Sequence, residues 1–321
     1  MAGILNLVQV RLLMTQTRDL IIVGGAVAAQ TSAIYASRSG MDVMVIADSY
    51  GGQINNTDVV ENYPGFKSIS GPDIADRYVE HMRDYDVTEE KGEKVVDIRK
   101  EDGIFEVENE SGEVFNSYSV IIATGGHRRR LDIPGEEEFE NKGVGYCAVC
   151  DGPLYKGETV AVIGGGYAGT EAAVYLSDIC EKVYVLSRSG VLKGEEITID
   201  KVKEADNVEV LEQALTQEFY GENMLQGLKY EDKNEEIQKL EVTGAFVEIG
   251  TVPNSDITDL VDTDETGHIE VDQDLETGVE GLYAAGDVVD WGAQQLIVSG
   301  GQACQAALNA SDYVKERKNR K

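Results

Sequence analysis

The chain carries the same pattern of strand, glycine turn and helix twice, and this repeat limits its fold more than any other feature. The first copy has an apolar strand at 19–23, then the turn Gly24-Gly25-Ala26-Val27-Ala28-Ala29 and a helix to about residue 37. A second strand, 42–46, ends near Asp48. Strand, tight turn, helix and strand at this size predict a βαβ unit with parallel strands.

The second copy begins 140 positions later. It has a strand at 159–163, the turn Gly164-Gly165-Gly166-Tyr167-Ala168-Gly169, a helix to about residue 177 and a strand at 182–186. The helix that follows such a turn offers unpaired backbone N–H groups and a positive dipole end to a pyrophosphate. One glycine turn is weak support for such a site, but two copies predict two dinucleotide sites, one for FAD and one for a nicotinamide.

A cysteine pair lies just before the second turn. Cys147-Ala148-Val149-Cys150 is followed at once by Asp151. A dithiol at this spacing closes into a small disulfide ring that is easily reduced and reoxidised, so beside a dinucleotide site it indicates electron transfer. Structural zinc is the alternative, but it needs about four ligands. The remaining candidates are isolated in the sequence: Cys180, Cys304, His81, His127 and His268.

Composition indicates an enzyme with a sizeable core rather than a disordered chain. Its 321 residues are 42% hydrophobic, which suits two domains. The net charge of -31, from 28 basic and 59 acidic residues, would repel nucleic acid and anionic membrane surfaces. Acid excess spread along the whole chain is typical of halophilic proteins, and few cysteines, two of them in a CxxC, predict a cytoplasmic location.

The first 18 residues form an expected N-terminal extension. Their apolar run, 4–14, contains Arg11 and no cleavage site follows it, so a targeting signal is not expected. Met14 is a second possible start, which leaves open whether residues 1–13 belong to the native protein. Apolar runs long enough for a membrane span are not found in the sequence.

Five segments carry a resemblance to a known family. The chain resembles the low-molecular-weight thioredoxin reductases, within the FAD- and nicotinamide-dependent disulfide reductases, from about Asp19 to Tyr313. The Cys-Ala-Val-Cys-Asp-Gly segment is the most specific match. The segments are Gly51-Gly52-Gln53-Ile54, Val60-Glu61-Asn62-Tyr63-Pro64-Gly65, Ala123-Thr124-Gly125, Tyr146 to Gly152, and Ala285-Gly286-Asp287-Val288.

The resemblance implies an α/β fold with two Rossmann-like three-layer nucleotide-binding domains, the second inserted in the first. Residues 19–125 and 250–321 would form the FAD domain, and residues 126–249 a NAD(P) domain that carries the CxxC. The two crossings between domains would act as a hinge. Family membership also implies a homodimer.

The resemblance assigns roles to individual residues. Cys150 matches the thiol that meets the flavin, Cys147 the thiol that attacks the protein substrate, and Asp151 the acid or base; alternatively Asp151 only begins an Asp-Gly-Pro turn. FAD would be bound by Gly24, Gly25, Ala26, Ala28, Ala29, Asp48, Gly52, Gln53, Asn62, Ala123, Thr124, Gly125, Gly286, Asp287, Gln294 and Gln295. The nicotinamide cofactor would be bound by Gly164, Gly166, Tyr167, Ala168, Gly169, Arg188 and Lys193.

Two departures from the family pattern concern FAD. Ala26 and Ala29 stand where the family usually has glycine, and a methyl group at Ala26 would crowd the pyrophosphate; the alternative is a turn that has lost FAD. Gln294 replaces an arginine beside the flavin, while Gln295 fits the retained glutamine.

A third departure concerns the electron donor. NADPH-specific members hold the 2'-phosphate with a cluster of arginines; here Arg188 is kept, Ser189 replaces one arginine and Lys193 replaces another. Because the end of this strand offers no carboxylate for NADH, we expect a modest preference for NADPH. The alternative is that Arg188 and Lys193 are solvated surface residues.

The sequence thus predicts a thioredoxin-disulfide reductase that passes electrons from NAD(P)H through FAD and the Cys147/Cys150 disulfide to a thioredoxin- or glutaredoxin-like protein. Three alternatives remain open. One is an FAD-dependent dithiol oxidase that sends electrons to oxygen, and a second is a similar enzyme with a donor other than a nicotinamide. The third is a flavin-binding redox sensor without turnover.

Overall fold

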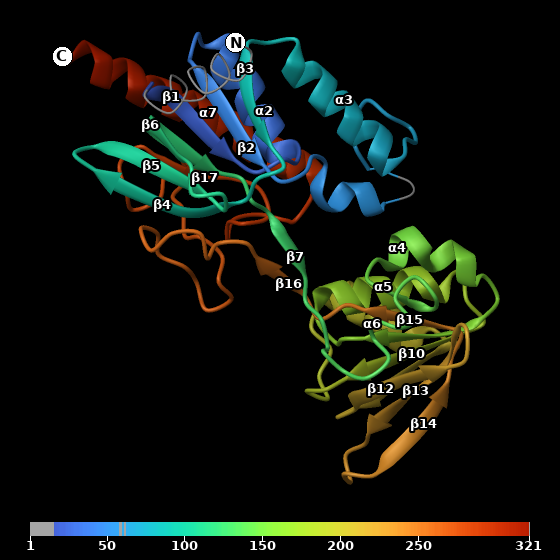
Figure 1. Ribbon diagram of the computed structural model, residues 1–321. Helices are drawn as coiled ribbons and strands as arrows, with labels where there is room; N and C mark the ends of the chain where they lie inside the picture. Colours follow the sequence, from blue (N-terminus) through green and yellow to red (C-terminus); the bar gives the residue numbers. More distant parts are fainter. Residues whose placement is uncertain (1–15, 58–59, 61, 321) are drawn as a thin grey trace. The chain divides into compact units, whose positions relative to one another are not determined.

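A computed structural model describes residues 16–57, 60 and 62–320, and the chain forms two compact units (Figure 1). The outer unit contains the described residues up to 127 and those from 252 onward, and the inserted unit is residues 128–251. The chain crosses between them in β7 (Gly126–Arg128) and β16 (Thr251–Pro253), which pair as a two-stranded sheet. Most of the predicted N-terminal extension, 1–18, lies outside the described residues.

The outer unit is built on one mixed sheet with the strand order β3-β2-β1-β6-β5-β4, and β17 pairs with β6. Strands β1, β2, β3, β6 and β17 pair in parallel, whereas β4 and β5 join the start of β6 as an antiparallel meander. The bounds are β1 Arg18–Val23, β2 Val43–Ala47, β3 Val87–Lys91, β4 Val95–Glu101, β5 Ile104–Asn109, β6 Val114–Ile122 and β17 Leu282–Ala284.

Helices cover one face of this sheet. Helix α2 (Val27–Arg38) lies beside α7 (Leu296–Asn319), and both contribute mainly alanines to the core, so the two helices pack closely. Alternate residues of β1 point to the opposite face, where they meet Phe105 and Val107 of β5 and apolar residues of the 257–289 segment. Helix α3 (Gly71–Arg83) is capped by Ser70, whose hydroxyl accepts the Asp73 N–H. A 3-10 turn, η1, spans Gly52–Asn56.

The inserted unit has a fully parallel sheet with the order β11-β10-β9-β15-β8. One face packs against α5 and α6 and the other against an antiparallel sheet, β12-β13-β14, so this unit also has three layers. The strands are β8 Val144–Gly145, β9 Thr159–Ile163, β10 Lys182–Ser187, β11 Val208–Glu212, β12 Leu215–Gly221, β13 Leu225–Glu231, β14 Ile237–Glu241 and β15 Gly244–Val247. The helical segments are α4 Ala148–Asp151, η2 Gly152–Tyr155, α5 Tyr167–Ser177 and α6 Glu196–Glu204.

Each unit therefore contains the βαβ arrangement that the glycine turns predict, and the two Rossmann-type domains of the expected fold class are confirmed. In the described part of the chain, helices long and apolar enough to cross a membrane are absent.

Candidate functional site

The first glycine turn links β1 to α2 and has no room for side chains at its first two positions. A Cβ on Gly24, which has φ +131°, would lie 2.1 Å from the Ala123 carbonyl oxygen, and one on Gly25 would lie 2.0 Å from that of Ser49. The Gln30 side-chain amide donates to the Gly25 carbonyl at 2.9 Å and fixes the turn from within the helix. Gln30, which is buried, was not among the predicted residues.

The two alanines of this turn fit their surroundings. Ala26 is the N-cap of α2 with φ -107° and ψ -170°, an extended conformation that any residue adopts. Ala29 is fully buried in the helix-side core, so its methyl group packs where a glycine would leave space. No described side chain caps the first turn of α2, which leaves its N–H groups to a phosphate ligand. On this test the turn fits a dinucleotide despite both alanines.

Other predicted FAD residues of the outer unit are joined by hydrogen bonds across long stretches of sequence. The Asn62 amide donates to Gln295 Oε1 at 3.1 Å, and Gln53 donates to the Gly126 carbonyl at 2.8 Å. Thr124 Oγ1 donates to the carbonyl of Asn254, whose own N–H donates to the Gly125 carbonyl. Asn254, which also bonds Thr124 O and His127, was missed by the sequence analysis.

The Gly286-Asp287 turn follows β17 and lies against α2 and α7. A Cβ on Gly286, with φ +87°, would come within 3.0 Å of the Ala28 Cβ. The Gly286 N–H donates to Gln302 Oε1 at 2.8 Å, and Ser299 Oγ donates to Asp287 Oδ1 at 3.2 Å. Gln302 and Ser299 are buried polar residues of α7 that hold this turn in place.

Gln294, the residue that replaces the family's arginine, contacts an imidazole. Its side-chain nitrogen lies 3.4 Å from His268 Nε2. His268 Nδ1 is in turn 2.7 Å from Thr266 Oγ1 and 3.7 Å from Asp264 Oδ2. The position therefore holds a neutral amide beside an ionisable ring in place of a fixed positive charge.

The second glycine turn, in the inserted unit, is built like the first. A Cβ on Gly164, with φ +133°, would lie 2.1 Å from the Glu248 carbonyl oxygen, and one on Gly169 2.1 Å from the Gly164 carbonyl oxygen. Gly166 is an extended N-cap without a side-chain cap for α5, and a Cβ there would meet nothing within 4 Å. Tyr167 and Ala168 are exposed at the start of the helix. This turn also fits a dinucleotide.

Strand register places Arg188 at the counterpart of Asp48. Val23 and Ile163 each precede a glycine turn, and they pair with Ile46 and Leu186 on the second strands. Asp48 and Arg188 each follow two residues later, and both are exposed. Lys193 is exposed as well, and its N–H donates to the Gly165 carbonyl at 2.7 Å, so the loop after β10 folds over the turn.

The redox segment lies in the inserted unit, where the short helix α4 begins one residue after Cys147. Cys147 is disulfide-bonded and half-buried, and its carbonyl accepts the Asp151 N–H at 3.1 Å. Cys180 and Cys304 are free thiols. The side chain of Cys150, the predicted flavin-facing thiol, lies outside the described part of the structure. Asp151 precedes η2, but its carboxylate does not cap that turn; Oδ2 faces Gly145 of β8, where a Cβ would come within 3.0 Å.

Glu248 is a further residue that the sequence analysis missed. Its carboxylate accepts the Ala148 N–H at 3.2 Å through Oε1, and Oε2 lies 3.8 Å from Arg128 Nη1. Burial raises the pKa of the Glu248 carboxyl, and Arg128 opposes this shift. A lone acid within the apolar run Ala245-Phe246-Val247-Glu248-Ile249 was the available signal.

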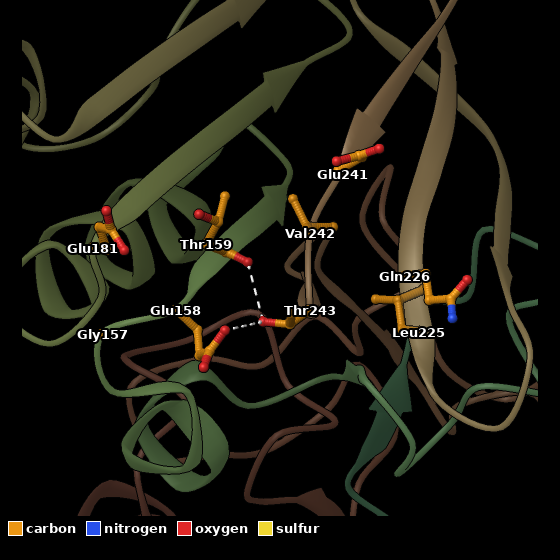
Figure 2. A pocket seen from close by; sticks show the side chains of 9 residues that line it. All are labelled: Gly157, Glu158, Thr159, Glu181, Leu225, Gln226, Glu241, Val242 and Thr243. Atoms are coloured by element: carbon orange, nitrogen blue, oxygen red, sulfur yellow. Dashed lines mark hydrogen bonds between the residues drawn. The ribbon is translucent and has the colours of Figure 1, made fainter.

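A surface hollow of about 380 Å³ lies elsewhere in the inserted unit (Figure 2). It opens at Thr159, the start of β9, whereas the Gly164 turn follows the other end of that strand. Thr243 Oγ1 donates to Glu158 Oε2 at 3.4 Å within it. None of the predicted site residues whose side chains the structure describes lines this hollow.

The family model for pyridine nucleotide-disulphide oxidoreductases matches residues 18–310. The chain belongs to this family. Both glycine turns and the cysteine pair lie inside the matched range.

Solved structures confirm the resemblance to thioredoxin reductases. The thioredoxin reductase of Lactococcus lactis, solved in the FR conformation, is 32% identical and superposes with a TM-score of 0.76, covering 94% of this chain and all of that one. Two curated relatives are the NADH dehydrogenase of Ferdinandcohnia aciditolerans, 42% identical, and one subunit of the alkyl hydroperoxide reductase of Staphylococcus aureus, 41% identical. Both alignments cover 92% of this chain but only 57% and 59% of the relative, so the chain spans little more than half the length of these proteins.

Proposed function

We propose that this oxidoreductase is a thioredoxin-disulfide reductase that draws electrons from NAD(P)H. One observation carries the proposal: Cys147 is disulfide-bonded in the same unit as the Gly164 turn, in a chain with a second glycine turn of the same build. In such an arrangement, cofactors bound at the two glycine turns would supply the electrons that reduce the disulfide. The likeness to thioredoxin reductases supports a thioredoxin-like protein as the substrate.

The cofactors would be held by residues already described. Gly24, Gly25, Ala26 and the first turn of α2 would bind the FAD pyrophosphate, with Asp48 on the ribose. The Gly164 to Gly169 turn would bind the nicotinamide cofactor in the same way. Bound FAD would accept a hydride from NAD(P)H and supply two electrons that reduce the disulfide.

The cysteines and Asp151 carry the exchange with the protein substrate. In the reduced enzyme the Cys147 thiolate attacks one sulfur of the substrate disulfide and displaces the other as a thiolate. The Cys150 thiolate then attacks Cys147 Sγ, which re-forms the enzyme disulfide and releases the second substrate thiolate. The enzyme dithiol is thereby oxidised as the substrate gains two electrons. Asp151, adjacent to the pair, would hold or deliver the protons that these thiolates exchange.

Arg188 supports NADPH as the preferred donor. It stands where the outer unit has Asp48, so the second site offers a cation to a 2'-phosphate at the position where the first offers a carboxylate to a ribose. An arginine grips phosphate through two N–H groups, whereas Lys193 adds only a flexible point charge. The preference should therefore be modest.

The protein partner would be a small thioredoxin- or glutaredoxin-like protein. A homodimer in the cytoplasm is the expected working form. The experiment is an assay of NADPH-dependent reduction of a disulfide-bonded thioredoxin by the FAD-loaded protein, with Cys147→Ser and Cys150→Ser as test variants. Cys304→Ser, which removes a free thiol, is the matched control. Both test variants should be inactive and the control active; turnover in either test variant would refute the assignment.

A further inference from the structure

The buried carboxylate of Glu248 contacts the backbone of the residue that follows the redox cysteine Cys147. It follows β15, its residue is only 7% exposed, and Oε1 accepts the N–H of Ala148, the residue bonded to Cys147. The Glu248 N–H donates to the Ile163 carbonyl at 2.8 Å, and its own carbonyl oxygen bounds Gly164. Backbone contacts on two sides therefore fix where this side chain points.

Two neighbouring groups stabilise the ionised form of the Glu248 carboxyl and oppose the effect of its burial. A buried carboxylate needs a donor or a cation, and here Ala148 N–H bonds one oxygen while Arg128 lies 3.8 Å from the other. Burial raises the pKa of Glu248, and Glu171 on α5 adds to that shift. The Arg128 side chain is 39% exposed against 7% for Glu248. Water therefore screens the Arg128 guanidinium more than the Glu248 carboxylate. The ionised carboxylate then leaves a net negative charge beside Ala148.

We propose that Glu248 is a positioning residue for Cys147, whose negative charge at the start of α4 lowers the thiolate fraction of that cysteine in the reduced enzyme. A like charge nearby disfavours the ionised form of a thiol, and only the thiolate attacks a disulfide. The charged groups that face Glu248 are Arg128 from β7 and Glu171 from α5, and Asp151 on α4 adds a second carboxylate near the pair. The proposal rests on the redox role given to Cys147 above.

The test measures Cys147 directly and needs neither nicotinamide nor a protein substrate. In the FAD-loaded full chain with Cys150→Ser, the rate of alkylation of Cys147 by iodoacetamide is followed against pH by mass spectrometry. Glu248→Gln should move the midpoint of this curve down by about one pH unit. At pH 7 the tenfold gain in thiolate, reduced by the lower nucleophilicity of a more acidic thiol, should give roughly threefold faster alkylation.

Two further variants separate charge from general disturbance. Glu248→Asp keeps the charge and should stay near the wild-type midpoint, and Glu204→Gln removes an exposed carboxylate of α6 as a matched control. An unchanged midpoint in Glu248→Gln, or an equal shift in Glu248→Asp, would overturn the proposal. If Glu248→Gln does not fold, Arg128→Gln is used in its place. Without Arg128 the Glu248 carboxylate is uncompensated, so the midpoint of the alkylation curve should move to higher pH. A downward shift or no shift would overturn the proposal.

Discussion

Asp48 and Arg188 occupy the same position in the two units, two residues beyond the register pairs Val23 with Ile46 and Ile163 with Leu186. One duplicated βαβ arrangement thus ends in an acid in its first copy and in a base in its second. Ribose hydroxyls bind to an acid at this position, and a 2'-phosphate binds to a base. Asp48 and Arg188 therefore give the two sites opposite charges at equivalent positions.

Replacing Arg188 by alanine should remove the preference for NADPH. Loss of one charge-assisted contact to a phosphate costs on the order of 1.5 to 3 kcal/mol, or roughly one to two decades in affinity. Catalytic efficiency with NADPH should fall by about that factor while efficiency with NADH stays the same. Equal use of both nucleotides before and after the change would show that Arg188 is only a solvated surface residue.

Two glycines of the second turn should respond differently to alanine. Gly164→Ala places a methyl group 2.1 Å from a backbone oxygen at φ +133°, so the free energy of unfolding should fall by about 3 kcal/mol or more. Gly166→Ala meets nothing within 4 Å and should change that free energy by less than about 0.5 kcal/mol. Denaturant unfolding of both variants makes the comparison.

Gly166→Ala copies the residue found at Ala26 in the first turn. Since a methyl group at this position crowds a pyrophosphate, the variant should bind NADPH more weakly although it folds normally. The reverse change, Ala26→Gly, should strengthen the binding of FAD. Fluorescence titrations of both nucleotides check this, and unaltered FAD affinity in Ala26→Gly would mean that the alanine does not crowd the pyrophosphate.

The two cysteines should differ in the absorbance spectrum of the FAD-loaded protein. Cys147→Ser should leave a Cys150 thiolate beside oxidised flavin and give a long-wavelength absorbance band. Cys150→Ser should not give this band, because Cys147 is assigned to the protein substrate. The opposite pattern would mean that Cys147 faces the flavin and Cys150 attacks the protein substrate. Full disulfide reductase activity in both variants would refute both assignments.

Molar salt should stabilise the protein. The 59 acidic residues exceed the 28 basic ones, and the carboxylates act on one another: burial, then Glu113 and Glu93, raise the pKa of Glu90. Raising potassium chloride from 0.01 to 1 M shortens the Debye length from about 30 to about 3 Å and weakens this repulsion. The unfolding midpoint should rise by roughly 2 to 3 °C, which corresponds to about 1 to 2 kcal/mol for a chain of this length. An unchanged or lower midpoint would refute the effect.

The strands next to the glycine turns were predictable because short apolar runs end at glycine. Residues 159–163 were predicted as a strand and form β9, and the predicted strand at 19–23 begins one residue earlier, as β1. The antiparallel sheet β12-β13-β14 was missed. Its strands mix charged and apolar residues without a turn signal strong enough to reveal them.

The supporting polar residues of the site could not be predicted, because their contacts join distant parts of the chain. Glu248 meets Ala148 across 100 residues, and Asn254 meets Thr124 across 130. Motif spacing reports only local geometry, so it finds turns and the cysteine pair but not the side chains that hold them. Gln302 had a nearer partner in Gly286, yet within a helix it had no pattern to distinguish it.

In the proposed mechanism, reducing equivalents from a nicotinamide reach the disulfide of Cys147 through bound FAD. The most direct measurement is anaerobic: the FAD-loaded protein is mixed with one equivalent of NADPH, quenched with iodoacetamide, and its cysteines are mapped by mass spectrometry. We expect flavin absorbance to bleach and recover while Cys147 and Cys150 become alkylated, with labelling of Cys180 and Cys304 the same with and without NADPH. Flavin that bleaches while Cys147 stays disulfide-bonded would contradict this electron-transfer route.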